Sequence, residues 1–263
     1  MKPWSKRHVD PVRSLAPRST WDAALTQATT VIAHAAFLTE GIREHATVVF
    51  PAQSHAEKEG TVVHPDGRVQ RLRRAIGNQG ETRPEWWVIA ELCKRLGLDT
   101  GVLTAPMVTQ QLVAAVPFYA GLTLDEIGGK GVRWQERPAV SAYPKGDVGP
   151  FDLQAPATAA QANGRLRLGT FRSIWAAPEV EVSPALKFLH PRQRVEIAPA
   201  DAQRLKLFPG EHVVVAADGA TVNATVTVRA QAPEGTVFLE EAIPGADSAS
   251  ALEGPLVEVR KAP

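Results

Sequence analysis

Four arginines lie close together in one stretch of the chain: Arg68, Arg71, Arg73 and Arg74. A planar guanidinium binds phosphate through two parallel hydrogen bonds, so the group is suited to clamp an anion or a pyrophosphate. Arginine clusters are also common on protein surfaces, where they form a solvated or partner-facing edge. Residue types alone leave both interpretations open.

A second group of chemically useful side chains occupies residues 169–175, with the sequence GTFRSIW. It combines a small residue, hydroxyls, a cation and two aromatic rings. Together these groups are suited to hold a heterocycle that carries phosphates. A packed loop fits the same sequence equally well.

The histidines, the cysteine and the acidic residues of the sequence give little support for a metal site or for covalent catalysis. The seven histidines are dispersed, and no pair has the i, i+4 spacing of a metal site on one helix. The single cysteine, Cys93, excludes a disulfide framework and a cysteine-ligated cluster held by this chain alone. Glu240 and Glu241 are neighbours on a predicted strand, so they point to opposite faces and cannot serve one site. We therefore expect no catalytic residue and no metal site.

Composition bounds the class of protein. The 263 residues allow one or two domains, and a net charge of +1 gives no overall field that would attract nucleic acid. No apolar run is long enough to cross a membrane, so no direct membrane insertion is expected. The first fourteen residues are polar and interrupted by proline, and they do not resemble the start of a fold.

The elements of the first half predict part of an α/β domain. We expect a helix at 20–28, a buried strand at 29–35, a helix at 39–45 and a buried strand at 47–50. Strands at 61–63 and 68–72, a helix at 84–96 and a second helix at 107–116 follow. The helix at 84–96 is expected to bury one apolar face: Trp87, Ile89, Ala90, Cys93 and Leu96. Residues 1–128 therefore read as a partial, Rossmann-like α/β domain, and residues 129–163 as a linker.

The second half, residues 164–263, predicts a small β-barrel with little helix. Pro199 is suited to begin a short helix that packs Ala202 and Leu205. Asp218-Gly219 predicts a tight hairpin, because both central residues of a type I′ turn need positive φ. In the strand that follows, Val222, Ala224 and Val226 alternate with polar residues, which indicates one buried face.

The segment 37–73, FLTEGIREHATVVFPAQSHAEKEGTVVHPDGRVQRLR, resembles the pattern of the molybdopterin oxidoreductase superfamily. The stretch from LGTFRSIW to VEIAPADAQRLKLFPGEHVVV resembles that superfamily's C-terminal molybdopterin dinucleotide-binding domain, which is a double-psi β-barrel. Residues 83–97 and 117–139 are most similar to the molybdopterin-oxidoreductase-like subunit of NADH-quinone oxidoreductase, or respiratory complex I. The resemblance covers nearly the whole chain but only the C-terminal part of that subunit.

The resemblance implies a set of cofactor-binding positions that includes Gly60, Thr61 and Arg68 in the first half and Gly169, Thr170 and Arg172 in the barrel. The family's cluster-binding cysteines and molybdenum-ligand segments do not occur in this chain. We therefore expect a structural part of that complex I subunit without its own redox centre, supporting electron transfer from NADH to quinone. No cofactor is expected in that role.

The alternative is the molybdopterin guanine dinucleotide-binding portion of an active molybdenum oxidoreductase. The expected partners are other peripheral-arm subunits of complex I or the missing N-terminal part of the same subunit. The expected location is cytoplasmic, at the inner face of the cell membrane through a complex. With half of an α/β sheet exposed, the chain alone is expected to be marginally soluble.

Overall fold

A computed structural model describes residues 10–15, 17–143 and 163–263. Contacts divide the chain into two compact units, one of residues 1–33, 37–49 and 156–263 and the other of residues 34–36 and 50–155. This grouping differs from the predicted division at residues 128 and 164, because residues 10–33 and 37–49 join the barrel's unit. None of the described helices has the length and apolar character that crossing a membrane requires.

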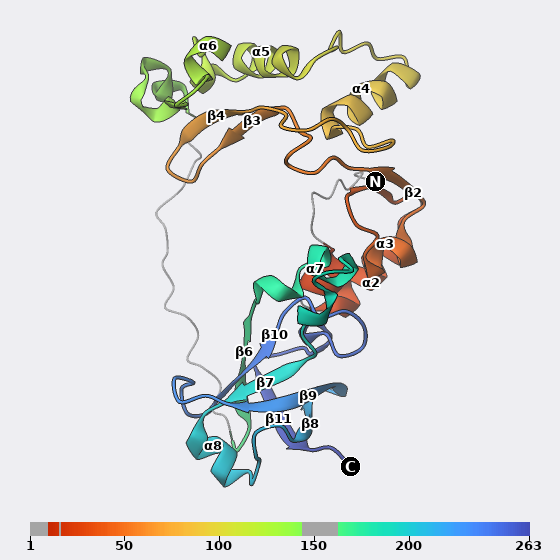
Figure 1. The fold of residues 1–263 in the computed structure, drawn as a ribbon, viewed down its shortest axis with the longest axis vertical. Helices are drawn as coiled ribbons and strands as arrows, with labels where there is room; N and C mark the ends of the chain where they lie inside the picture. Colours follow the sequence, from red (N-terminus) through yellow and green to blue (C-terminus); the bar gives the residue numbers. More distant parts are fainter. Residues whose placement is uncertain (1–9, 16, 144–162) are drawn as a thin grey trace. The chain divides into compact units, whose positions relative to one another are not determined.

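The first unit is built on a closed six-stranded barrel, drawn from green to blue in Figure 1. Its strands are β6 (Leu166–Phe171), β7 (Arg194–Ile197), β8 (His212–Ala217), β9 (Ala220–Val228), β10 (Thr236–Glu240) and β11 (Leu256–Lys261). Around the barrel they follow the order β10, β6, β11, β8, β9, β7. The inward-facing aliphatic residues are almost fully buried, among them Val195, Val213 and Leu239, each 0% exposed. This burial confirms the predicted small barrel.

The strand pairing of the barrel has internal two-fold symmetry. Strand β6 runs parallel to β10, β7 runs parallel to β9, and the remaining pairs are antiparallel. Exchanging β6, β7 and β8 with β9, β10 and β11 leaves every pairing and direction unchanged. Two interlocked halves of this kind are what the double-psi prediction requires.

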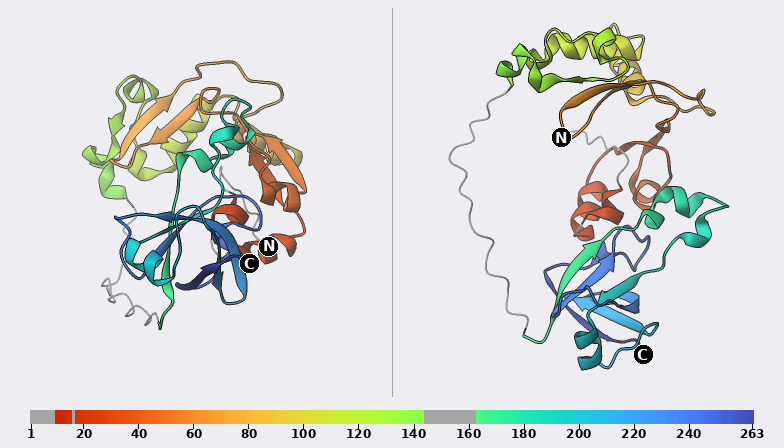
Figure 2. Two further views of the ribbon diagram at one scale, coloured as in Figure 1. Left: turned by 60° about the horizontal axis from the view of Figure 1, so that its bottom comes forward. Right: turned by 60° about the vertical axis from the view of Figure 1, so that its left-hand side comes forward.

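Local signals in the barrel sequence produce the expected elements. Helix α8 (Pro199–Arg204) buries Ala202, and Asp201 in its first turn accepts a 2.6 Å hydrogen bond from the backbone N–H of Gly235. Asp218 and Gly219 have φ of 44° and 89° between β8 and β9, which confirms the predicted tight turn. Helix α8 and the short helix α7 (Pro178–Val182) lie at opposite ends of the barrel in Figures 1 and 2.

The start of the described chain also belongs to this unit, in contrast to the expectation for the first fourteen residues. Helix α1 (Pro11–Ser14) buries Val12 and Arg13, which are 0% and 3% exposed. The Arg13 guanidinium donates to the Ala242 carbonyl and, at 2.7 Å, to the Glu181 carboxylate. Both partners are more than 160 residues away in the sequence. The residues next to Arg13 therefore could not indicate that its side chain would be buried.

A two-stranded sheet joins β1 (Ile32–Ala35) and β2 (Val48–Pro51), with helix α2 (Arg18–Thr26) before it and α3 (Glu40–His45) between the strands. Backbone N–H groups of residues 48 and 52 donate to the carbonyls of residues 31 and 35, which is a parallel register. The predicted burial of these strands is wrong, because Val48 and Val49 are 41% and 36% exposed. Two strands are too few to show the Rossmann-like domain, which stays a prediction.

The second unit holds a three-stranded antiparallel sheet of β3 (Gly60–Val63), β4 (Arg68–Leu72) and β5 (Val132–Arg133). Helices α5 (Ala105–Ala115) and α6 (Leu124–Ile127) contact this sheet, and α4 (Glu85–Arg95) precedes them (Figure 1). Their small core contains Val69, Leu122 and Ile127.

Two sequence expectations fail in the second unit. The predicted linker contains β5 and the 3₁₀ helices Trp134–Glu136 and Pro138–Ala142, while its residues 144–162 lie outside the described part. The predicted apolar face of α4 is not buried: Ile89 is 50% and Leu96 78% exposed, and Val88 is the buried residue of the helix. The described chain supplies no element that covers that face.

Candidate functional site

The predicted barrel residues meet at the ends of β6 and β10. These two strands are parallel, so both end on the same side, with Thr170 opposite Leu239 and Phe171 opposite Glu240. Because successive side chains alternate, Glu240 is fully buried whereas Glu241 reaches the loop outside. The structure thus confirms that the two glutamates face different surroundings.

Glu241 connects Thr170 and Arg172. The Thr170 hydroxyl donates a hydrogen bond to the Glu241 carboxylate, and Arg172 Nε lies 3.8 Å from the other carboxylate oxygen. The Arg172 side chain is 55% exposed, so its guanidinium has free surface for a further partner. A hydroxyl and a cation therefore lie side by side at this end of the barrel.

Glu240 is a buried carboxylate whose charge is only partly compensated. Arg194 Nε lies 3.1 Å from Glu240 Oε2, but neither carboxylate oxygen has a well-aligned hydrogen bond among the described residues. Burial raises the pKa of Glu240 above its usual value, and the charge of Arg194 opposes that rise. The Arg194 guanidinium also covers the Phe171 ring, 5.0 Å from its centroid.

Sequence reasoning missed Arg194 and the polar role of Glu240. Arg194 lies some twenty residues after the loop that was singled out, and the barrel register brings it beside Phe171. The adjacent Glu240-Glu241 pair was a usable signal, because one of two neighbours on a barrel strand must face inward.

Gly169 has a packing role in the barrel. A Cβ atom at this position would lie 2.5 Å from the ring of Phe238 on the neighbouring strand β10. Glycine at 169 is therefore explained by strand packing without a cofactor, and its binding role stays a prediction.

The other predicted residues belong to the second unit and do not form one cluster there. Gly60 pairs with Leu72 at one end of the β3–β4 hairpin, whereas Arg68 lies at the other end. The Thr61 hydroxyl is hydrogen-bonded to Thr109 at 2.8 Å, and Arg68 lies near Asp66. These groups have internal partners, and their cofactor role stays a prediction.

The four arginines between residues 68 and 74 also do not form one cluster. Arg71 forms a 2.8 Å ion pair with Glu59, whereas Arg74 lines a cavity and has no ionic partner among the described residues. The hairpin therefore does not present the four guanidinium groups as one clamp.

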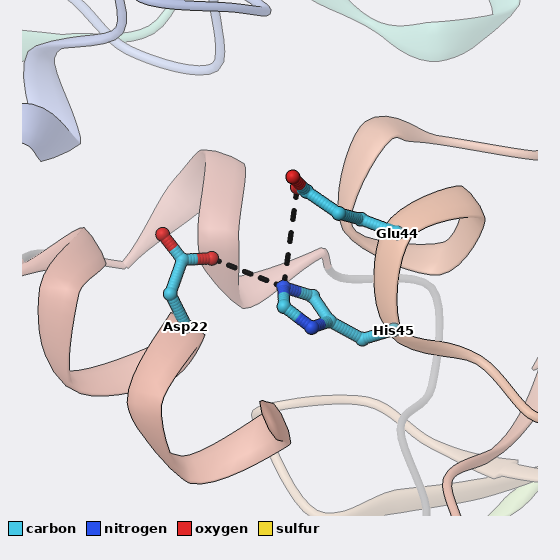
Figure 3. A group of neighbouring side chains, drawn as sticks. All are labelled: Asp22, Glu44 and His45. Carbon is cyan, nitrogen blue, oxygen red and sulfur yellow. Dashed lines mark hydrogen bonds and ion pairs between the residues drawn. The ribbon is translucent and has the colours of Figure 1, made fainter. Parts of the chain in front are cut away.

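One group with metal-ligand chemistry assembles in the first unit, from α2 and α3 (Figure 3). His45 Nε2 lies 3.1 Å from an Asp22 oxygen and 4.0 Å from a Glu44 oxygen. Arg18 Nε approaches the other Asp22 oxygen at 3.1 Å, and Arg18 also pairs with Glu40 at 2.8 Å. A guanidinium thus already compensates the carboxylates, and the arrangement is that of an ion-pair network that joins the two helices.

Comparisons with known proteins match both halves of the chain. A family model described as molybdopterin oxidoreductase matches residues 8–95, and one described as molybdopterin dinucleotide binding domain matches residues 179–256. The F420-dependent formate dehydrogenase 2 subunit alpha of Methanococcus maripaludis is 28% identical over 229 residues, which cover 78% of this chain and 34% of that protein. The NADPH-Fe(3+) oxidoreductase subunit alpha of Geobacter sulfurreducens is 28% identical over 200 residues, or 73% of this chain and 21% of that protein.

Among solved structures, acetylene hydratase from Pelobacter acetylenicus superposes with a TM-score of 0.72 at 14% identity, covering 99% of this chain and 44% of that one. At that identity the likeness shows a shared fold alone. The chain spans about a third or less of the length of the two curated relatives. The chain thus carries a segment that matches the molybdopterin oxidoreductase model, followed by one that matches the molybdopterin dinucleotide-binding domain model, and it is homologous to formate dehydrogenase and NADPH-Fe(3+) oxidoreductase alpha subunits.

Proposed function

We propose that this chain is the cofactor-holding C-terminal part of a molybdenum oxidoreductase, with a molybdopterin guanine dinucleotide held at the β6–β10 end of the barrel. The observation that carries the proposal is the convergence of Thr170, Arg172, Arg194 and Glu240 there. Two of these residues, Arg194 and Glu240, fall inside the stretch that matches the dinucleotide-binding family model. The expectation that no cofactor binds is not supported by that match.

The side chains present fit such a group chemically. Arg172 and Arg194 are 55% and 40% exposed, so each can donate to phosphate oxygens. The Thr170 hydroxyl can donate or accept, and the buried Glu240 carboxylate positions Arg194, whose Nε lies 3.1 Å from it. The bound cofactor would supply the metal for redox chemistry. These residues would orient the cofactor, and the two arginines would neutralise its phosphates.

The rest of the enzyme is proposed to come from another chain or segment. A parallel sheet is normally covered on both faces, and two strands alone are only marginally stable. The exposed valines of β2 and the small share of the relatives that this chain spans both support a further part of the enzyme that covers or extends this sheet.

A cofactor-free, structural role within respiratory complex I stays a hypothesis. The relatives described above are formate dehydrogenase and NADPH-Fe(3+) oxidoreductase subunits, which favours the cofactor-binding alternative. Attachment to the inner face of the membrane through a complex likewise stays a prediction.

The test is to purify the chain from its native host with its associated proteins and to measure molybdenum and pterin. Stoichiometric pterin in the wild type, reduced about tenfold in Arg172→Gln and Arg194→Gln, is the expected result. Arg165→Gln is the matched control, because Arg165 is equally exposed but precedes the opposite end of β6.

A wild-type complex that contains no pterin would overturn the cofactor-holding proposal. If other components of complex I were present in that fraction, the structural role would be supported instead. If all three arginine variants retained pterin, the cofactor could not be held at this end of the barrel.

A further inference from the structure

A buried cation holds the start of the described chain against the barrel loops. Arg13 of α1 lies in the stretch that matches the molybdopterin oxidoreductase model, and its side chain is 3% exposed. Its guanidinium contacts Glu181, His190 and Ala242, which all lie in the stretch that matches the dinucleotide-binding model. Arg13 therefore joins the two matched stretches within one compact unit.

Every nitrogen of the Arg13 guanidinium has a partner. Nε donates to the Ala242 carbonyl, and Nη1 donates to a Glu181 oxygen at 2.7 Å. Nη2 lies 3.4 Å from both the Ala176 carbonyl oxygen and His190 Nε2. A guanidinium can only donate hydrogen bonds, so His190 Nε2 accepts and the ring is neutral, with its proton on Nδ1. The contact between Arg13 and His190 thus requires an unprotonated imidazole.

The surroundings of His190 favour this neutral ring. Burial is the largest cause that lowers its pKa, and the charge of Arg13 on α1 lowers it further. The charge of Glu181 on α7 and a hydrogen bond with the Pro191 backbone raise the pKa, but the net direction is downward from the ordinary value of 6.5. Glu181 is 39% exposed and already paired with Arg13, so water and that ion pair weaken its attraction for a protonated ring.

The other hydrogen bonds between α1 and the barrel loops come from two buried serines. Ser248 Oγ donates to the Arg13 carbonyl at 3.3 Å, and Ser250 Oγ donates to the Val12 carbonyl at 3.0 Å. Hydroxyl groups carry no charge that changes near neutral pH, whereas an imidazole changes its charge between about pH 5 and pH 8. The contact between Arg13 and His190 is therefore the part of this joint that responds to pH near neutrality.

We propose that Arg13 and His190 form a pH-sensitive latch that holds α1 on the barrel unit. The neutral ring accepts from Arg13 and keeps the helix in place. Protonation removes this acceptor and brings a second cation to a buried guanidinium, so the contact is lost and α1 opens. The latch consists of protein contacts alone, so the proposal does not depend on a bound cofactor.

The direction of the pH effect follows from the affinity of the folded chain for the proton. The folded joint binds this proton less readily than a free imidazole does, so α1 is held most firmly above pH 6.5 and more weakly as the pH falls below that value. The barrel core is aliphatic and contains no imidazole, so its strands are expected to stay protected.

The opening of α1 can be followed through its own backbone amides. The N–H groups of Ser14 and Leu15 donate to the carbonyls of Asp10 and Pro11. A helix of four residues is not stable by itself, so α1 unwinds once it leaves the barrel unit and these amides exchange with solvent. Amide exchange at residues 10–15 therefore reports the state of the latch.

The test is hydrogen–deuterium exchange of the full chain, with each rate corrected for the intrinsic effect of pH. Between about pH 8 and about pH 5, exchange at residues 10–15 is expected to rise at least about threefold in the wild type, while β8 stays protected. His190→Gln keeps an acceptor near the position of Nε2 but cannot take up a proton, so its α1 protection should not change with pH. His212→Gln is the matched control, because this exposed histidine at the start of β8 should leave the response intact.

Protection of α1 that does not change with pH in the wild type would overturn the proposal. An unchanged response in His190→Gln, shown to be folded by thermal melts, would also overturn it. His45 lies beside Asp22 in the same unit, but it is present in wild type and variant alike. A response that disappears in His190→Gln therefore cannot come from His45.

A measurement on the wild type alone covers the case in which His190→Gln does not fold. The ring signals of His190 are followed by NMR through the same pH range. Their midpoint should coincide with the midpoint for loss of α1 protection. Two clearly separate midpoints would show that another group controls the opening.

Discussion

At the scale of single residues, Glu240 is a buried carboxylate at the barrel site whose negative charge is unfavourable there. Its side chain is fully buried, and its ionic partner among the described residues, Arg194, is 40% exposed. Burial raises its pKa above the reference value of 4.5. A carboxyl group with a raised pKa in the native state stabilises the fold below its unfolded-state pKa. That contribution is lost as pH rises through the native-state pKa.

Glu240→Gln is therefore expected to remove a pH-dependent penalty. The variant should melt at or above the wild-type temperature at pH 7–8, and the difference should close near pH 4, where the wild-type carboxyl is protonated. Thermal melts across this range measure the effect, with Glu241→Gln as the control at the neighbouring, partly exposed carboxylate. A variant that melted well below the wild type at pH 7 would show that the ion pair with Arg194 outweighs the cost of burial.

At the scale of elements, the close pairing of β6 and β10 explains a glycine that resemblance alone assigned to cofactor binding. Gly169 faces the ring of Phe238, and even a methyl group there would overlap it. Gly60, the other glycine assigned by resemblance, has nothing within 4 Å of its missing Cβ. An added methyl group would therefore disturb strand packing at Gly169 but meet no protein atom at Gly60.

Gly169→Ala is expected to destabilise the barrel by about 1–3 kcal/mol through overpacking against Phe238. Gly60→Ala should leave stability nearly unchanged, and any loss of bound cofactor in that variant would then report a ligand contact. Urea unfolding of the full chain measures the first effect, and pterin content measures the second. If Gly169→Ala were as stable as the wild type, the Phe238 ring would have to turn aside at little cost.

At the scale of the whole molecule, the described chain exposes several large apolar side chains. Val48 and Val49 of the two-stranded sheet are exposed, as are Ile89 of α4 and Leu96, which directly follows that helix. Open strand edges and exposed valines favour pairing with other chains. The exposed valines of β2 are therefore a surface at which association of the chain can be tested.

The isolated chain is expected to associate at micromolar concentration, as size-exclusion chromatography would show. The double variant Val48→Lys/Val49→Lys should shift the chain toward monomer, because lysine at an open strand edge opposes pairing. Ala230→Lys/Gln231→Lys adds the same charge at exposed positions after β9 and serves as the control. A wild type that is monomeric and melts cooperatively would contradict the prediction.

Prediction from sequence worked where the signal is local. The Asp218-Gly219 turn, the short helix after Ala198 and the alternation along β9 each depend on a few neighbouring residues, and each appears in the structure. It failed where burial depends on distant partners. The α4 face was expected to be buried because its apolar residues share one side, but the described chain holds nothing to cover it.

The barrel strands, the family resemblance and the polar character of residues 169–175 can all be read from the order of the residues, because periodicity, turn residues and motif order are properties of neighbouring positions. The prediction that residues 169–175 form a loop is wrong for residues 169–171, which belong to β6. Three other features emerge only in the folded chain: Arg194 lies over Phe171, Arg13 is buried, and Gln53 meets two arginines and two indoles at one cavity. Those contacts join residues that are far apart in the chain. They arise when strand register and loop packing bring distant side chains together, and no local pattern records them.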